Sequence, residues 1–103
     1  MNEVRILVVD DEPVTRMITE SVLAAQGFIV EAAESAEMAL EMLADGFVPQ
    51  VILLDVIMPG MSGYEACRRL RADPRFEHLP IVMLTALDDQ KSIDEAYFSG
   101  ATD

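Results

Sequence analysis

The chain has 103 residues, of which 51% are hydrophobic, and its 19 acidic and 7 basic residues give a formal charge of −12. This length fits one domain with a single core, residues 1–103. The negative charge repels nucleic acid and anionic lipid, and the apolar runs are far shorter than the roughly 20 residues that cross a bilayer. We therefore expect a cytoplasmic protein that binds neither nucleic acid nor membrane.

The N-terminal quarter of the chain predicts a strand followed by an amphipathic helix. The apolar run at about residues 4–9 stops at Asp10-Asp11. Pro13 suits the first turn of a helix, and Gly27 can supply the left-handed residue that ends it. Between them, apolar side chains at three-and-four spacing predict a core-facing stripe, formed by Val14, Met17, Ile18, Val22 and Leu23.

The middle of the chain predicts two more strand–helix units. Residues 28–33 have the mixed polarity of an edge strand, and Ser35 can cap the following helix. Residues 51–54 form an unbroken apolar run that stops at Asp55. The next loop contains Pro-Gly-Met-Ser-Gly, which permits sharp turning, and leads into a helix at about 63–72.

The last predicted unit follows a connector at residues 73–80. Residues 81–84 predict a fourth strand, which stops at Thr85, and a helix is expected at about 89–99. We interpret Cys67 as a packing residue and His78 as a surface residue. The arginines on and after the third helix are interpreted as a solvated face; they are Arg68, Arg69, Arg71 and Arg75.

The alternation of short strands and helices predicts an α/β fold with a parallel, doubly wound sheet. In parallel strands the carboxyl ends share one edge, where the ligand crevice of such folds lies. This edge would gather Asp10, Asp11, Asp55 and Thr85.

Clustered carboxylates repel one another unless one takes up a proton or a cation lies between them. Oxygen ligands select a hard cation, and Mg²⁺ needs fewer protein oxygens than Ca²⁺. Such a site suits phosphoryl transfer to a carboxylate. Alternatives remain open, because Asp10-Asp11 could be a solvated strand end that caps the next helix, and Thr85 could be an ordinary β-branched strand residue.

Three segments together resemble the receiver domain of two-component response regulators. They are the acidic segment Leu7–Pro13, the segment Leu53–Gly63 around Asp55, and the segment Pro80–Ala86 around Thr85. The resemblance extends over the whole chain. It implies a flavodoxin-like sheet with strand order 2-1-3-4 and a phosphorelay function rather than an enzyme.

The resemblance also implies a role for each matching residue. Asp55 would accept a phosphoryl group from a histidine kinase or phosphotransfer protein. Asp11, Asp55 and the Ile57 carbonyl would bind Mg²⁺ directly, and Asp10 would bind it through water. Thr85 would hydrogen-bond the phosphoryl group and act as the switch.

The chain departs from the family pattern at its end, because the fifth strand, the fifth helix and the family's phosphate-binding lysine are not among the 103 residues. Lys91 is interpreted as a solvated charge. We therefore expect impaired phosphorylation, apolar side chains left uncovered and self-association through the edge of the fourth strand. Whether an output domain follows residue 103 stays open at this point.

Two alternative functions remain. An aspartate-nucleophile phosphatase usually carries a second Asp two residues after the nucleophile, where this chain has Ile57. A scaffold would use the acidic site without ever being phosphorylated.

Overall fold

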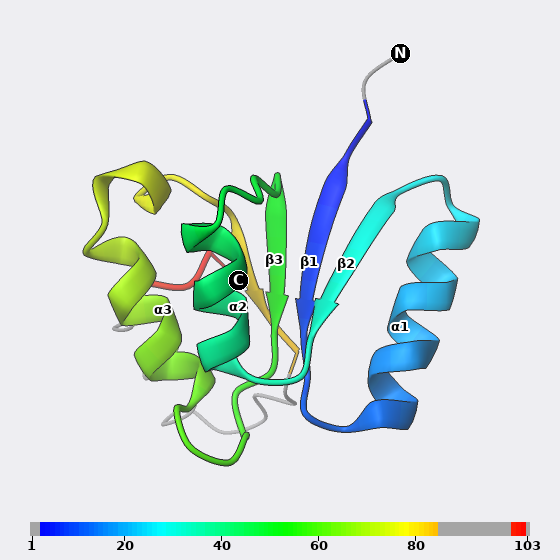
Figure 1. The fold of residues 1–103 in the computed structure, drawn as a ribbon, viewed down its shortest axis with the longest axis horizontal. Coiled ribbons are helices and arrows are strands. Elements are labelled where there is room, and N and C mark those ends of the chain that lie inside the picture. Colours follow the sequence, from blue (N-terminus) through cyan, green and yellow to red (C-terminus); the bar gives the residue numbers. More distant parts are fainter. Residues whose placement is uncertain (1–2, 85–99, 103) are drawn as a thin grey trace.

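The computed structural model describes residues 3–84 and 100–102, and it alternates strands with helices along the chain (Figure 1). The predicted helix at 89–99 lies outside the described residues. The elements are β1 (Arg5–Val9), α1 (Pro13–Ala25), β2 (Ile29–Ala33), α2 (Ala36–Ala44), β3 (Val51–Leu54), α3 (Gly63–Arg71), the short 3₁₀ helix η1 (Pro74–Phe76) and β4 (Ile81–Met83).

All pairings among these strands are parallel, and the order across the sheet is β2-β1-β3-β4. The predicted α/β class and strand order are therefore confirmed. The register aligns Val9 with both Ala33 and Leu54, so the carboxyl ends of the three strands lie level. Whatever follows these strands in the sequence is brought to one edge of the sheet.

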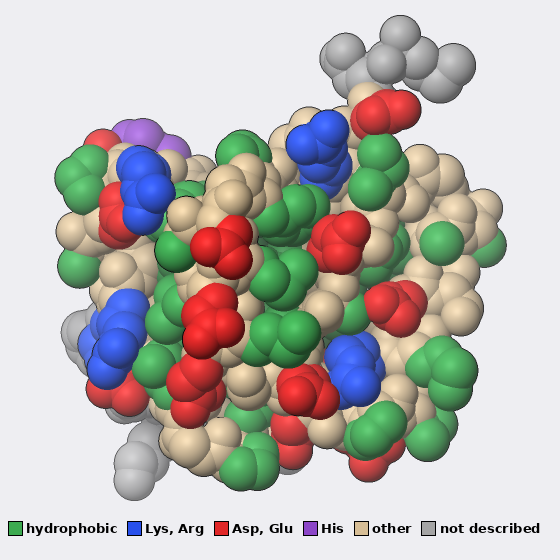
Figure 2. Space-filling model, in the orientation of Figure 1, with side chains coloured by type: hydrophobic (Ala, Val, Ile, Leu, Met, Phe, Trp, Pro, Cys, Tyr) green, Lys and Arg blue, Asp and Glu red, His purple; other side chains and the backbone are tan. Residues whose placement is uncertain are grey.

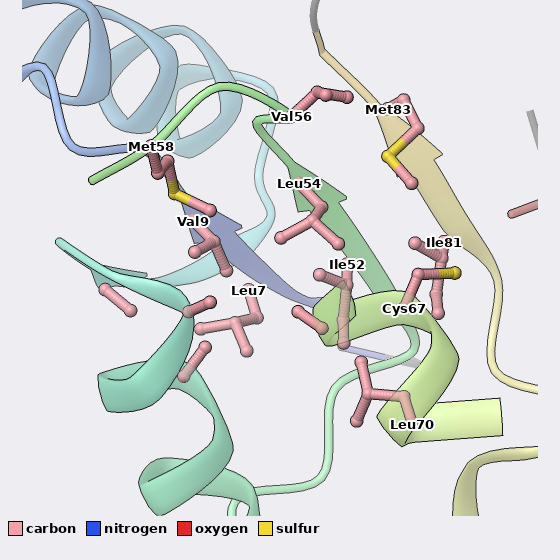
Figure 3. Packing of buried hydrophobic residues seen from close by; sticks show 14 of the residues in the cluster. Leu7, Val9, Ile52, Leu54, Val56, Met58, Cys67, Leu70, Ile81 and Met83 are labelled. Atoms are coloured by element: carbon pink, nitrogen blue, oxygen red, sulfur yellow. The ribbon is translucent and has the colours of Figure 1, made fainter. Parts of the chain in front are cut away.

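The main core lies between the sheet and helices α2 and α3. Side chains alternate across a strand, and Leu7 and Val9 of β1 point to this side with Ile52 and Leu54 of β3 (Figure 3). All four are at most 1% exposed. Cys67 of α3 is fully buried in the same cluster, which confirms its interpretation as a packing residue.

Right-handed crossovers place α1 on the opposite face of the sheet from α2 and α3, because the chain reverses direction across the sheet after β2. The predicted core stripe of α1 is wrong: the helix has no buried residue. Four of its apolar side chains are 57–58% exposed, namely Val14, Met17, Ile18 and Val22. The amphipathic pattern is present, but the contacts of α1 with β1 and β2 leave these four side chains more than half exposed.

The ends of the helices follow local chemistry. The Ser35 hydroxyl accepts a hydrogen bond from the Met38 N–H at 3.0 Å, as expected for the cap of α2. Gly27 has a φ of 94°, which confirms the left-handed residue after α1. The cap of α1 is Glu12, whose carboxylate accepts from the Val14 N–H at 2.8 Å.

Strand β4 is an end strand of the sheet, and residues 100–102 lie along its start. The Thr102 N–H donates to the Ile81 carbonyl at 2.9 Å, and the Ile81 N–H donates to the Thr102 hydroxyl at 3.0 Å. The predicted open edge of the fourth strand is therefore partly covered. Within the described ranges, no helix has the length and hydropathy needed to span a bilayer.

Candidate functional site

Two carboxylates follow neighbouring strands at the level edge of the sheet. Asp10 comes directly after β1 and Asp55 directly after β3. The Asp55 N–H donates to the Val9 carbonyl at 2.9 Å, and the Asp10 N–H donates to the Ala33 carbonyl at 3.1 Å. The sheet ladder thus continues one residue beyond each strand, and it fixes the backbone that carries both acids.

Asp11 completes an acidic cluster with Asp10 and Asp55. One carboxylate oxygen from each of the three residues lies within 4.8 Å of the others. The helix cap is Glu12, not either of the two preceding acids, so capping does not account for the pair. Hard oxygen donors at this separation fit Mg²⁺, which is commonly held by one or two carboxylates and several waters.

Asp10 is the only charged residue buried among those described, with 4% of its surface exposed. Burial is the largest cause that raises the pKa of its carboxyl above the ordinary value. The Glu12 N–H donates to Oδ1 at 3.0 Å and opposes this rise, whereas the negative charge of Asp55 adds to it. A cation near these oxygens would offset the repulsion that raises the pKa.

A pocket of about 290 Å³ opens beside Asp10 and Asp55. Helix α1 contributes Thr15 and Thr19 to its wall, and Leu84 lines it from the chain just after β4. Sequence reasoning missed both threonines. Their four-residue spacing on one side of the helix that follows Asp10-Asp11 was the available signal.

The loop between Asp55 and α3 is held close to the strand end by Gly63. The Gly63 N–H donates to the Val56 carbonyl at 2.9 Å, and the Ser62 hydroxyl caps α3 by accepting from the Glu65 N–H at 3.3 Å. A Cβ atom added at Gly63 would collide with the Asp55 carbonyl oxygen and lie 2.9 Å from the Val56 Cα. Only glycine allows this approach, as the sharp turn predicted from the loop sequence requires.

Of the remaining candidate residues, Ile57 falls within the described part of the chain. Ile57 lies in the same loop, and its side chain is exposed. Thr85, Ala86 and Lys91 lie outside the described residues. The roles of Ile57 and Thr85 therefore stay predictions.

One arginine was misassigned from the sequence. Arg71 is not solvated like its neighbour Arg69; its guanidinium donates to Gly100 O at 2.7 Å, Phe76 O at 2.8 Å and the Thr102 hydroxyl at 3.2 Å. His78, in contrast, is 93% exposed in its side chain, as expected. Nothing in the local sequence distinguishes Arg71, because its acceptors include residues about 30 positions away.

Comparisons with known proteins agree with this geometry. Response regulator PleD from Caulobacter vibrioides is 43% identical over 99 residues, which are 96% of this chain but only 22% of PleD. The phosphate regulon transcriptional regulatory protein PhoB from Rhizobium meliloti is 37% identical over 96% of this chain and 43% of its own length. The chain therefore spans less than half of either relative.

Solved structures show the same fold. The Vibrio cholerae chemotaxis protein CheY4 superposes with a TM-score of 0.91 at 32% identity, over 98% of this chain and 83% of that one. A response regulator structure from Chloroflexus aurantiacus gives a TM-score of 0.92 at 35% identity, over 99% and 83% of the two chains. The family model for the response regulator receiver domain matches residues 6–103. The chain belongs to the response regulator receiver domain family, a group of two-component signalling modules.

Proposed function

We propose that this receiver domain is a phosphoacceptor whose nucleophile is Asp55. The observation that carries the proposal is the grouping of three carboxylates within 4.8 Å at the carboxyl end of the sheet. Asp55 follows a strand whose alternate side chains are buried, lines the pocket and is only part-buried, so an incoming phosphoryl group can reach it.

In the proposed reaction, a carboxylate oxygen of Asp55 attacks the phosphorus of a phosphohistidine. A P–O bond forms as the P–N bond breaks, and the imidazole of the donor leaves with the electron pair and takes up a proton. The donor is a histidine kinase or a phosphotransfer protein. Thr85 hydrogen-bonds the transferred group and changes position in response, which is the proposed switch.

Mg²⁺ is the proposed cofactor, because the three acids offer only hard oxygen donors. Asp11, Asp55 and the Ile57 carbonyl would hold the ion directly, and Asp10 would hold it through water. When bound, Mg²⁺ neutralises charge on the transferring oxygens. Asp10 contributes a buried negative charge, and among the described residues no basic side chain contacts its carboxylate, which favours retention of a cation at this edge.

The proposed biological context is a longer protein. PleD and PhoB extend well beyond the matched region, so we propose that an output domain follows residue 103 in the intact protein. We propose that residues 1–103 form the phosphoacceptor part without the last strand and helix of the family, and that this chain is phosphorylated more slowly than an extended one.

Intact mass spectrometry tests the function directly. The chain is incubated with acetyl phosphate and Mg²⁺, and one phosphoryl adduct is expected on the wild type but not on Asp55→Asn. Asp45→Asn, at the exposed end of α2, is the matched control and should accept the adduct normally.

Each alternative function gives a different result. Steady release of inorganic phosphate without an adduct would support a phosphatase, and no reaction with any donor would support an unphosphorylated scaffold. An adduct that persists in Asp55→Asn would contradict the assignment of the nucleophile.

A further inference from the structure

The contacts of Arg71 join three separate segments at the far end of α3. The guanidinium Nε donates to Gly100 O at 2.7 Å, Nη1 to Phe76 O at 2.8 Å and Nη2 to the Thr102 hydroxyl at 3.2 Å. All three acceptors are uncharged oxygens. A planar guanidinium can donate in three directions at once, which the single ammonium of lysine does less well.

Gly100 is shaped for this contact. Its φ is 98°, and an added Cβ would lie 2.6 Å from Cγ of Arg71. Both features favour glycine at a position where backbone and arginine stem touch. The three donor contacts and this close approach fix the position of the backbone at residue 100.

The position of Thr102 in turn affects β4. Its hydroxyl accepts from both the Arg71 guanidinium and the Ile81 N–H, and its own N–H donates to the Ile81 carbonyl. Strand β4 has only three residues. On its inner side it pairs with β3; on its outer side, within the described part of the chain, Thr102 makes the hydrogen bonds.

Strand β4 leads directly into the pocket. The Leu84 N–H donates to the Leu54 carbonyl at 2.9 Å, and Leu84 lines the pocket with Asp10 and Asp55. Because the strand is so short, a contact that fixes its start at Ile81 also fixes the position of Leu84 at the pocket.

We infer that Arg71 is a positioning residue for the phosphoacceptor site. It holds Thr102 against Ile81, and through β4 it sets the position of Leu84 at the pocket. It does not touch the acidic cluster. The effect on phosphorylation rests on the proposed function of Asp55, whereas the effect on β4 does not.

Amide hydrogen exchange of the full chain tests the effect on β4. In Arg71→Met, exchange at Ile81 and Thr102 should accelerate about tenfold relative to Leu7 of β1, because donors to Gly100 and Thr102 are lost. Normalising to Leu7 separates this effect from global destabilisation. Arg71→Lys should restore part of the protection, and Thr102→Val should expose Ile81 even with Arg71 present.

Arg69→Met is the matched control, since Arg69 lies on the same helix and its ion pair within the described ranges is a 3.9 Å contact with Glu65, both side chains being about half exposed. Exchange at Ile81 should not change in this variant. Equal acceleration of Ile81 and Leu7 in Arg71→Met, or no acceleration at either, would overturn the inference.

A second readout separates positioning from folding. Mg²⁺ affinity should be unchanged in Arg71→Met, because Asp10, Asp11 and Asp55 are not on β4, whereas acetyl phosphate should modify Asp55 about tenfold more slowly. An unchanged rate would overturn the link to the site. If the wild type accepts no phosphoryl group while the exchange pattern holds, the proposed function fails and the role of Arg71 in β4 stands.

Discussion

The two faces of the sheet are built differently. On the face covered by α2 and α3, the side chains of β1 and β3 are almost fully buried, with Leu7 and Ile52 at 0% and 1% exposure. On the other face, Ile6 and Val8 of β1 are also buried, but helix α1 has no buried residue, and its Ile18 and Val22 are 57% exposed. The larger cluster of buried side chains therefore lies on the α2/α3 side, which also holds the helix whose N-terminus positions the loop after Asp55.

This difference shows what an amphipathic pattern reports. The three-and-four spacing of apolar residues in α1 identifies side chains that share one side of a helix. It does not report whether another element covers that side. On the face shown in Figure 2, acidic side chains gather over α2 and the sheet, and basic side chains lie over α3, near the start of β1 and beside α1.

The largest expected effect on stability is on the face of the sheet that α2 and α3 cover. Leu7→Ala removes a fully buried side chain and should lower the free energy of unfolding by about 2–5 kcal/mol. Denaturant titration measures this loss. The control on α1, Val22→Ala, should lower the free energy of unfolding by no more than about 0.5 kcal/mol. Equal losses for the two variants would contradict the comparison of the two faces.

The next largest effect is expected at Gly63, where the start of α3 lies against the loop that follows Asp55. Gly63→Ala places a Cβ against the Asp55 carbonyl, so the loop must move, and we expect a loss of about 1–3 kcal/mol together with weaker Mg²⁺ binding. Thermal melts and a Mg²⁺ titration measure both. Gly27→Ala is the control. Its added Cβ meets no atom within 4 Å, and only the φ of 94°, which alanine rarely adopts, would be strained. This variant should lower stability without changing Mg²⁺ affinity.

A smaller effect of opposite sign is expected at Asp10. Its raised pKa means that ionisation disfavours the folded state, so Asp10→Asn should raise the melting midpoint by a few degrees at pH 7 without Mg²⁺. The Asn carbonyl can still accept from the Glu12 N–H. The gain should shrink as the pH falls toward the ordinary carboxyl pKa of 3.8, where the unfolded chain also becomes protonated.

Mg²⁺ should reverse this order. It stabilises the wild type by binding the folded state and should stabilise Asp10→Asn less. If Asp10→Asn melts below the wild type in metal-free buffer at pH 7, repulsion among these carboxylates does not strain the metal-free fold.

The smallest effect is expected on the exposed side of α1. Ile18→Ser should change the free energy of unfolding by no more than about 0.5 kcal/mol, because the side chain is already 57% exposed. The matched change on the face that α2 and α3 cover is Leu43→Ser in α2. It removes a side chain that is 3% exposed and should be strongly destabilising. A large loss for Ile18→Ser would show that α1 is covered in solution.

Much of the fold follows from the sequence because its signals are local. Unbroken apolar runs predicted the strands, and Ser35 and Gly27 mark helix ends at which the structure places them. The level carboxyl ends of parallel strands then bring Asp10 and Asp55 together. The three-acid cluster could therefore be predicted without coordinates.

The features that sequence reasoning missed depend on contacts between distant segments. Met17 was expected in the core but is 58% exposed, because the spacing of apolar residues does not show whether another element covers that side of the helix. Arg71 looks like its neighbours in a basic run, and only the folded chain places Gly100 and Thr102 beside it. Thr15 and Thr19 line the pocket because α1 turns this side of the helix toward Asp10 and Asp55, which the local sequence does not show.

The central claim is that Asp10, Asp11 and Asp55 form one divalent-cation site. Mn²⁺ can replace Mg²⁺ as a paramagnetic probe, and an NMR titration of the wild type should selectively broaden the amide signals of these three residues at a low Mn²⁺ ratio. Asp11→Asn should weaken the effect. Broadening centred on Glu37 and Glu41 of the acidic helix α2, with the signals of Asp10 and Asp55 unaffected, would contradict the account.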